Sequence, residues 1–214
     1  MKKLHACTAA VVVGAFTWIA QANAEPVSAV EISNISAFNP PFSAVVGWEF
    51  VANSDITVTS LGMWDEFEDG FNNDAPEVGL WTLNGDLLAS TIVTSNDELI
   101  DGFRYSDISD VKLTGDTHYV VAGVFREVVA NTNPNSFAFD ADISNVYPTD
   151  VMWLDSRGAN SDTLIFPTDF NNFDGFFGAN FRFVDEPTTC LLIITGLLGL
   201  GMTTTQRRAK LIKQ

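Results

Sequence analysis

The chain has 214 residues, of which 46% are hydrophobic and 18% are charged. This composition excludes a largely disordered chain, and the length suits one domain with a sizeable core. The stretch between Glu25 and Glu186 holds all 27 acidic residues but only five basic ones, a net charge of −22. Such a field repels polyanions, so we expect no nucleic-acid partner.

The first 24 residues are typical of a secretory signal peptide. Two lysines precede an uncharged apolar run, and Ala22 and Ala24 are small residues at the positions that a signal peptidase inspects. We predict cleavage before Glu25. An uncleaved N-terminal anchor helix is the alternative.

Residues 25–185 are predicted to form one domain of short β-strands separated by turns. Asn84 and Gly85 lie between two apolar runs, which is a strong signal for a hairpin. Leu61 and Met63 follow Ile56 and Val58 with a shift of one residue, which indicates a β-bulge. The expected strands cover residues 46–51, 56–63, 78–83, 87–93, 111–113, 119–125, 137–139, 151–154 and 176–184. We therefore predict an all-β fold, an antiparallel, jelly-roll-like β-sandwich.

The C-terminal segment, residues 186–214, has a hydrophobic span at about 188–205 and a basic tail at 206–214. At about 1.5 Å per residue, a helix over this span reaches about 27 Å, close to the thickness of a bilayer core. The basic tail predicts a cytoplasmic end, with the acidic domain on the other side of the membrane. A buried helix of a globular domain is the alternative, but it would need one apolar face rather than an apolar run on all sides.

Glu186 and Pro187, the Leu/Gly-rich span and the pair Arg207 and Arg208 together resemble the PEP-CTERM sorting signal. The resemblance implies export in a Gram-negative bacterium that makes exopolysaccharide, with a transient anchor in the inner membrane. It further implies processing by an exosortase and a final location at the cell surface or outside the cell. Asp185 stands where the pattern has its first proline.

Stretches between about 45 and 125 also resemble a β-sandwich domain of unknown function that is common among PEP-CTERM proteins. The matching pieces include Val46 to Phe50, Val78 to Trp81 and Tyr119 to Gly123. These are packing and turn residues, so the resemblance implies the fold and brings no catalytic residue.

An acidic loop between two expected strands is the candidate metal site. Carboxylate oxygens are the ligands that calcium prefers, and the loop offers several. The candidate ligands are Asp65, Glu66, Glu68, Asp69 and Asp74. The alternative is a solvated acidic loop without a metal, and we expect no other cofactor.

Two tryptophans are candidates for stacking on a glycan. Trp64 is expected at a strand end beside the acidic loop, and Trp153 precedes Asp155 and Arg157. The alternative for both rings is that they fill the core.

We predict no catalytic residue. His118 is the one histidine after the predicted cleavage site, and we expect it before a strand, where it caps a turn. Cysteine–histidine chemistry is excluded from the domain because Cys7 and Cys190 lie in the two end segments.

These observations predict an exported, non-enzymatic protein of the cell surface or of the exopolysaccharide matrix. The expected partners are signal peptidase, an exosortase, exopolysaccharide or another glycan, and the membrane through the C-terminal span before processing. A carbohydrate-binding module, with or without the assistance of calcium, is the first alternative, and a glycoside hydrolase is the second.

Overall fold

The computed structural model describes residues 24–32, 36–38, 42–71, 75–126, 137–139, 148–171 and 175–185. For residues 36–38, 137–139 and 171 it describes the backbone alone. All regular elements in these ranges are β-strands. None of the described segments is a helix that is long and apolar enough to cross a bilayer, and the expected span at 188–205 lies outside the described residues.

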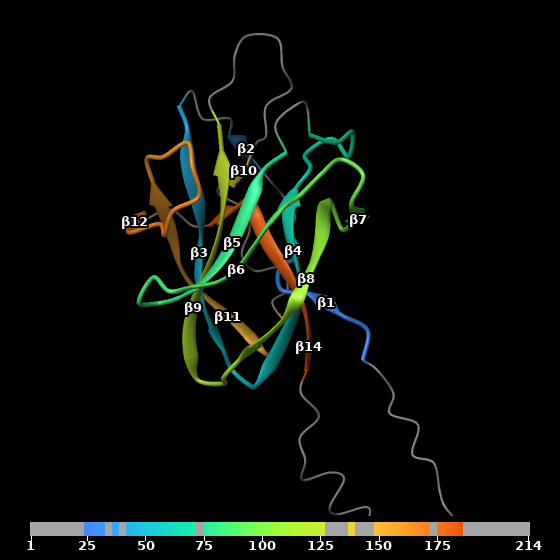
Figure 1. The fold of residues 1–214 in the computed structure, drawn as a ribbon, viewed down its shortest axis with the longest axis vertical. Coiled ribbons are helices and arrows are strands. Elements are labelled where there is room, and N and C mark those ends of the chain that lie inside the picture. The colour runs from blue at the N-terminus through green and yellow to red at the C-terminus, as the bar shows by residue number, and fades with distance from the viewer. Residues whose placement is uncertain are drawn as a thin grey trace, which may run out of the picture.

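The strands form two large antiparallel sheets and one small one (Figure 1). One large sheet has the order β1-β14-β4-β8-β7, the other β12-β11-β3-β9-β5-β6, and the small one β13-β10-β2. Their bounds are β1 (Val27–Ser28), β2 (Ser36–Phe38), β3 (Ala44–Ala52), β4 (Ile56–Trp64), β5 (Glu77–Thr82), β6 (Leu87–Ile92), β7 (Glu98–Ile100), β8 (Phe103–Leu113), β9 (Thr117–Phe125), β10 (Phe137–Phe139), β11 (Val151–Ala159), β12 (Asp169–Asn171), β13 (Phe176–Phe177) and β14 (Ala179–Asp185). The predicted all-β fold is confirmed, and the two curled sheets pack as a β-sandwich.

Aromatic side chains fill the space between the two large sheets. Because side chains alternate across a strand, Trp48 and Phe50 of β3 lie on the same face and meet β14. The rings of Trp48 and Phe181 stack with centroids 5.9 Å apart, and those of Phe50 and Phe181 lie 4.8 Å apart. The indole N–H of Trp48 donates a 2.8 Å hydrogen bond to the carbonyl of Ala179, so the buried polar atom is satisfied.

Two local predictions are confirmed by the strand registers. The pairing of β4 with β8 shifts between Val58 and Ser60, which is the β-bulge expected from the change of phase. Strands β5 and β6 pair antiparallel around Gly85, whose φ of 89° lies in the left-handed region that favours glycine.

Other strands differ from the prediction. Strand β8 begins at Phe103 rather than at residue 111, and β1, β2, β7 and β12 were not expected. Acidic and serine residues interrupt the apolar pattern of β8 because much of its middle is exposed.

A buried hydrogen-bond network attaches the N-terminal segment to the core. The side-chain N–H₂ of Asn180 donates to the carbonyl of Val30 and to the hydroxyl of Tyr105, at 2.8 Å each. The hydroxyl of Tyr105 also donates to the Ser28 hydroxyl at 3.1 Å, and burial raises the pKa of this tyrosine. Strand β1 is thereby held against β14, and its residue Val27 pairs with Phe183.

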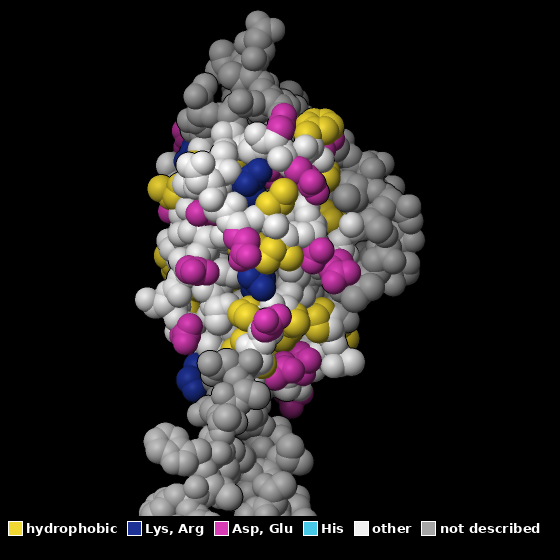
Figure 2. All heavy atoms as spheres, turned by 90° about the vertical axis from the view of Figure 1, so that its right-hand side faces the viewer, with side chains coloured by type: hydrophobic (Ala, Val, Ile, Leu, Met, Phe, Trp, Pro, Cys, Tyr) yellow, Lys and Arg dark blue, Asp and Glu magenta, His cyan; other side chains and the backbone are white. Residues whose placement is uncertain are grey.

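The chain enters and leaves the sandwich at the same end because β1 runs antiparallel to β14 (Figure 1). Figure 2 shows acidic side chains spread over one side of the molecule, with few basic ones between them.

Candidate functional site

A buried ion pair lies on the outer face of the six-stranded sheet. Glu49 of β3 points away from the core because its neighbours Trp48 and Phe50 point into it. Its carboxylate accepts a 3.0 Å hydrogen bond from Nε of Arg157 on β11, and a second from Nη2 of the same guanidinium. Both side chains are buried. A buried carboxylate requires such a partner, so the pair ties β3 to β11.

His118 completes this cluster from β9. Its Nδ1 lies 2.8 Å from Oε1 of Glu49, while 44% of its side chain remains exposed. The carboxylate therefore fixes the ring and leaves its other edge toward solvent. The expectation that His118 precedes a strand and caps a turn is wrong: it is the second residue of β9.

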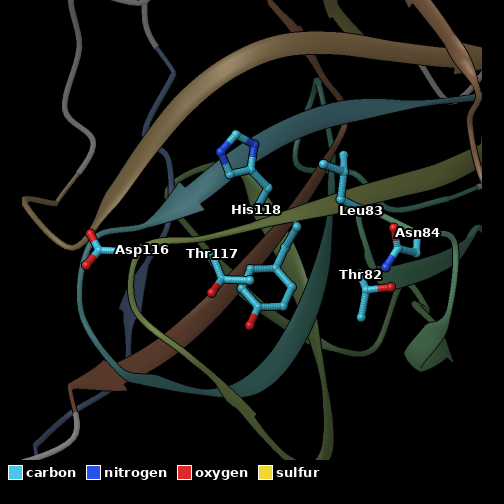
Figure 3. A pocket seen from close by; sticks show the side chains of 7 residues that line it. Thr82, Leu83, Asn84, Asp116, Thr117 and His118 are labelled. Carbon is cyan, nitrogen blue, oxygen red and sulfur yellow. The ribbon is translucent and has the colours of Figure 1, made fainter.

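An open depression of about 480 Å³ borders His118 at the end of this sheet. Leu83 and Asn84 of the β5–β6 turn form one side, and Asp116 of the β8–β9 turn forms another (Figure 3). His118 and Thr117 point to opposite sides of β9 in this view. The lining thus combines an imidazole, a carboxylate, an amide and hydroxyls with apolar surface, which is the mixture that a polar, uncharged ligand needs.

Phe170 of β12 forms the other end of the cluster. It pairs with Arg157 in the strand register, and its ring centroid lies 3.8 Å from the guanidinium carbon. Arg157 covers one face of this ring, yet 62% of Phe170 is exposed, so the opposite face is open to solvent. A guanidinium beneath an aromatic ring also holds the ring in place.

The two tryptophans singled out from the sequence do not form such a platform. Trp64 is only 6% exposed and belongs to the core, so its ring has no open face on which a sugar could stack. Trp153 is partly buried and packs against the core, and its buried indole N–H has no hydrogen-bond partner among the described residues. An exposed ring is present on this face, but it is Phe170.

The acidic loop is held together by Arg104 of β8. Asp65 is buried, and its Oδ2 accepts a 2.7 Å hydrogen bond from Nε of Arg104 and a 2.9 Å bond from the amide of Gly70. Nη2 of Arg104 donates to the carbonyl of Glu68. In the described ranges no three His, Cys, Asp or Glu side chains are grouped so that they could hold a metal ion.

The remaining candidate ligands of this loop are not gathered around Asp65. Glu66 is half-buried, and Glu68 and Asp69 are exposed. Asp74, the last candidate calcium ligand, lies outside the described residues. The same holds for five residues of the predicted processing sites: Ala22, Glu186, Pro187, Arg207 and Arg208. Ala24 and Glu25 are described and exposed.

The residues of the Glu49 cluster were missed for a physical reason. Glu49 is the single charge in the apolar strand AVVGWEFVA, whereas β11 carries Asp155 as well as Arg157. A lone charge in an apolar strand, such as Glu49, is a signal for a buried ion pair, but its partner Arg157 is 108 residues away in sequence and the strand carrying it cannot be identified from local pattern.

Residues 32–177 match the family described as Domain of unknown function (DUF4082). The match covers more than half of the chain, which therefore belongs to this family. No curated protein and no solved structure matches the chain.

Proposed function

We propose that the chain is an exported, non-enzymatic protein of the cell surface or of the extracellular polysaccharide matrix. On this proposal a signal peptidase removes residues 1–24, and an exosortase acts on the segment from Glu186. The anchor is the hydrophobic span at about 188–205, with the basic tail in the cytoplasm. Asp185, where the sorting pattern has proline, is the feature that sets how efficiently the segment is processed.

The observation that carries the proposal is the pairing of β1 with β14. Because the two strands are antiparallel neighbours, the start of β1 at Val27 and the end of β14 at Asp185 lie at one end of the sandwich. A domain attached through either terminal segment is then held by this end alone. The outer face of the six-stranded sheet around Glu49, Arg157 and Phe170 lies away from the attached end of the chain and stays available to the surroundings.

A binding role suits the observed chemistry better than catalysis does. Nδ1 of His118 is bonded to Glu49, and the same carboxylate accepts from Arg157. This arrangement fixes three side chains in place rather than pairing a base with a nucleophilic hydroxyl or thiol. The proposed jelly-roll-like winding has support in the chain path, which crosses between the large sheets at β3–β4, β4–β5, β6–β7 and β8–β9, and from β12 to β14 through β13 of the small sheet.

The intact mass of the protein from the surface and medium of its native host tests the proposal. A species that starts at Glu25 and ends near Glu186 is the expected result, and excess mass would identify glycosylation or an attached anchor. A species that retains residues 190–214 would refute exosortase processing and leave a membrane-tethered domain. Asp185→Pro restores the first proline of the sorting pattern. If an exosortase recognises this motif, the substitution should increase the processed fraction.

A further inference from the structure

We propose that the outer face of the six-stranded sheet binds an extended, uncharged polysaccharide, with Phe170 as its stacking platform. The depression beside His118 forms the other end of the site. The inference rests on the proposed function, which places the chain in a polysaccharide matrix.

The ring of Phe170 is held in one orientation by its neighbours. Phe170 is 62% exposed, but its ring is held from below by Arg157, which is itself buried and bonded to Glu49. An exposed aromatic ring that is already fixed loses little side-chain entropy when a ligand stacks on it. The open face of the ring suits the apolar face of a sugar.

The spacing of the polar groups calls for a chain of sugars rather than a single one. Phe170 is aligned with Gly47 of β3 through Arg157, whereas His118 is aligned with Val51 of the same strand. The two ends of the face are thus separated by three strand spacings, roughly 14 Å, and by four residues along β3, roughly 13 Å. Between them, Asp155 pairs with Glu49 in the register and is half-buried, so its carboxylate can accept bonds from hydroxyl groups.

The charge of the face selects the class of polysaccharide. The face carries three carboxylates, Glu49, Asp155 and Asp116, but a single guanidinium, that of Arg157, which is already paired with Glu49. These residues belong to the stretch from Glu25 to Glu186, whose net charge is −22. Polymers rich in uronic acid or sulfate are repelled by this field, whereas neutral glycans are not.

Native affinity electrophoresis tests the inference on the full 214-residue chain in a non-ionic detergent that carries no sugar headgroup. The gels contain either neutral polysaccharides (glucans, mannans, xylans, galactans, and the neutral fraction of the host's own exopolysaccharide) or alginate as the anionic polymer. We expect retardation by at least one neutral polymer and none by alginate. Phe170→Ala should weaken the apparent affinity roughly tenfold or more, as removal of the main aromatic contact of a site does, and Phe170→Tyr should retain it.

Phe67 provides a matched control, because it is a phenylalanine with 64% exposure on the acidic loop. Phe67→Ala should bind like the original chain. Equal retardation of the Phe170→Ala and Phe67→Ala variants would overturn the inference, and so would binding to alginate alone or to none of the polymers. The mass measurement on the native protein is independent of these gels, so a failure of polysaccharide binding is distinguishable from a failure of export and processing.

Discussion

Replacing Arg157 by methionine tests whether the ion pair between Glu49 and Arg157 is shielded from water strongly enough that losing one partner destabilises the fold. Both side chains are less than a tenth exposed, at 5% for Arg157 and 8% for Glu49. Methionine keeps most of the side-chain volume and its contact with Phe170, but it removes the charge. The carboxylate of Glu49 is then left in a buried position with His118 as its neighbour.

Removing one partner of a buried ion pair costs about 3–5 kcal/mol of unfolding free energy. We expect about 3 kcal/mol here, at the low end, because His118 remains bonded to Glu49 and is 44% exposed. For a domain of this size, each kcal/mol lowers Tm by about 2–4 °C, so Tm should fall by about 6–12 °C.

Thermal and urea unfolding of a set of variants give the comparison. Glu49→Leu combined with Arg157→Met removes both charges, and this double variant should recover most of the lost stability. The exposed pair between Arg182 and Glu98 is the matched control, with Nη1 and Oε2 3.3 Å apart and the Glu98 side chain 69% exposed. Glu98→Gln should cost less than about 1 kcal/mol. If Arg157→Met costs no more than Glu98→Gln, the buried pair does not hold the sheet face together and the reasoning fails.

Three further predictions concern other parts of the sandwich. Gly47→Ala should prevent folding or lower Tm more than any surface change, because its Cβ would lie 2.0 Å from the backbone oxygen of Val121; a variant with an unchanged Tm would contradict this register of β3 and β9. Asp185→Asn should raise the unfolding free energy at neutral pH by up to about 1 kcal/mol, because burial and the nearby Asp150 raise the pKa of Asp185 in the folded chain, and ionisation then opposes folding. This gain should vanish below the ordinary pKa of 3.8, and a gain that persists there would exclude the electrostatic cause. Millimolar Ca²⁺ should leave Tm unchanged because the buried Asp65 is occupied by Arg104, and a rise in Tm that Asp65→Asn abolishes would refute this.

The parts of the fold that follow from short-range pattern were predictable. The hairpin at Asn84 and Gly85 needs a positive φ that glycine supplies, and the bulge near Val58 is visible as a change of phase within one strand. Strand β7 and the first half of β8 were not predictable in the same way. Their exposed residues carry polar and acidic side chains, so the apolar alternation that marks a strand is absent.

The candidate site was less predictable because exposure depends on the neighbouring strands. Trp64 and Phe170 both lie at strand ends or edges beside acidic residues in sequence. The partners of β4 on both sides bury Trp64, whereas β12 is the outermost strand of its sheet and leaves Phe170 open. Strand order, which sets this difference, arises from contacts between residues far apart in the chain.

The outer face of the six-stranded sheet is divided into a covered half and an open half, and the sequence of the covered half explains why. Trp81 of β5 lies flat over Gly79, where a Cβ would come within 2.4 Å of its ring. Phe166 packs edge-on against Trp81, with centroids 6.2 Å apart, and so covers this half with the segment that precedes β12. That same segment delivers Phe170 to the sheet edge, beside Arg157. Shortening the loop between Arg157 and Phe170 should therefore lower stability and polysaccharide binding together, whereas Phe170→Ala should lower binding alone.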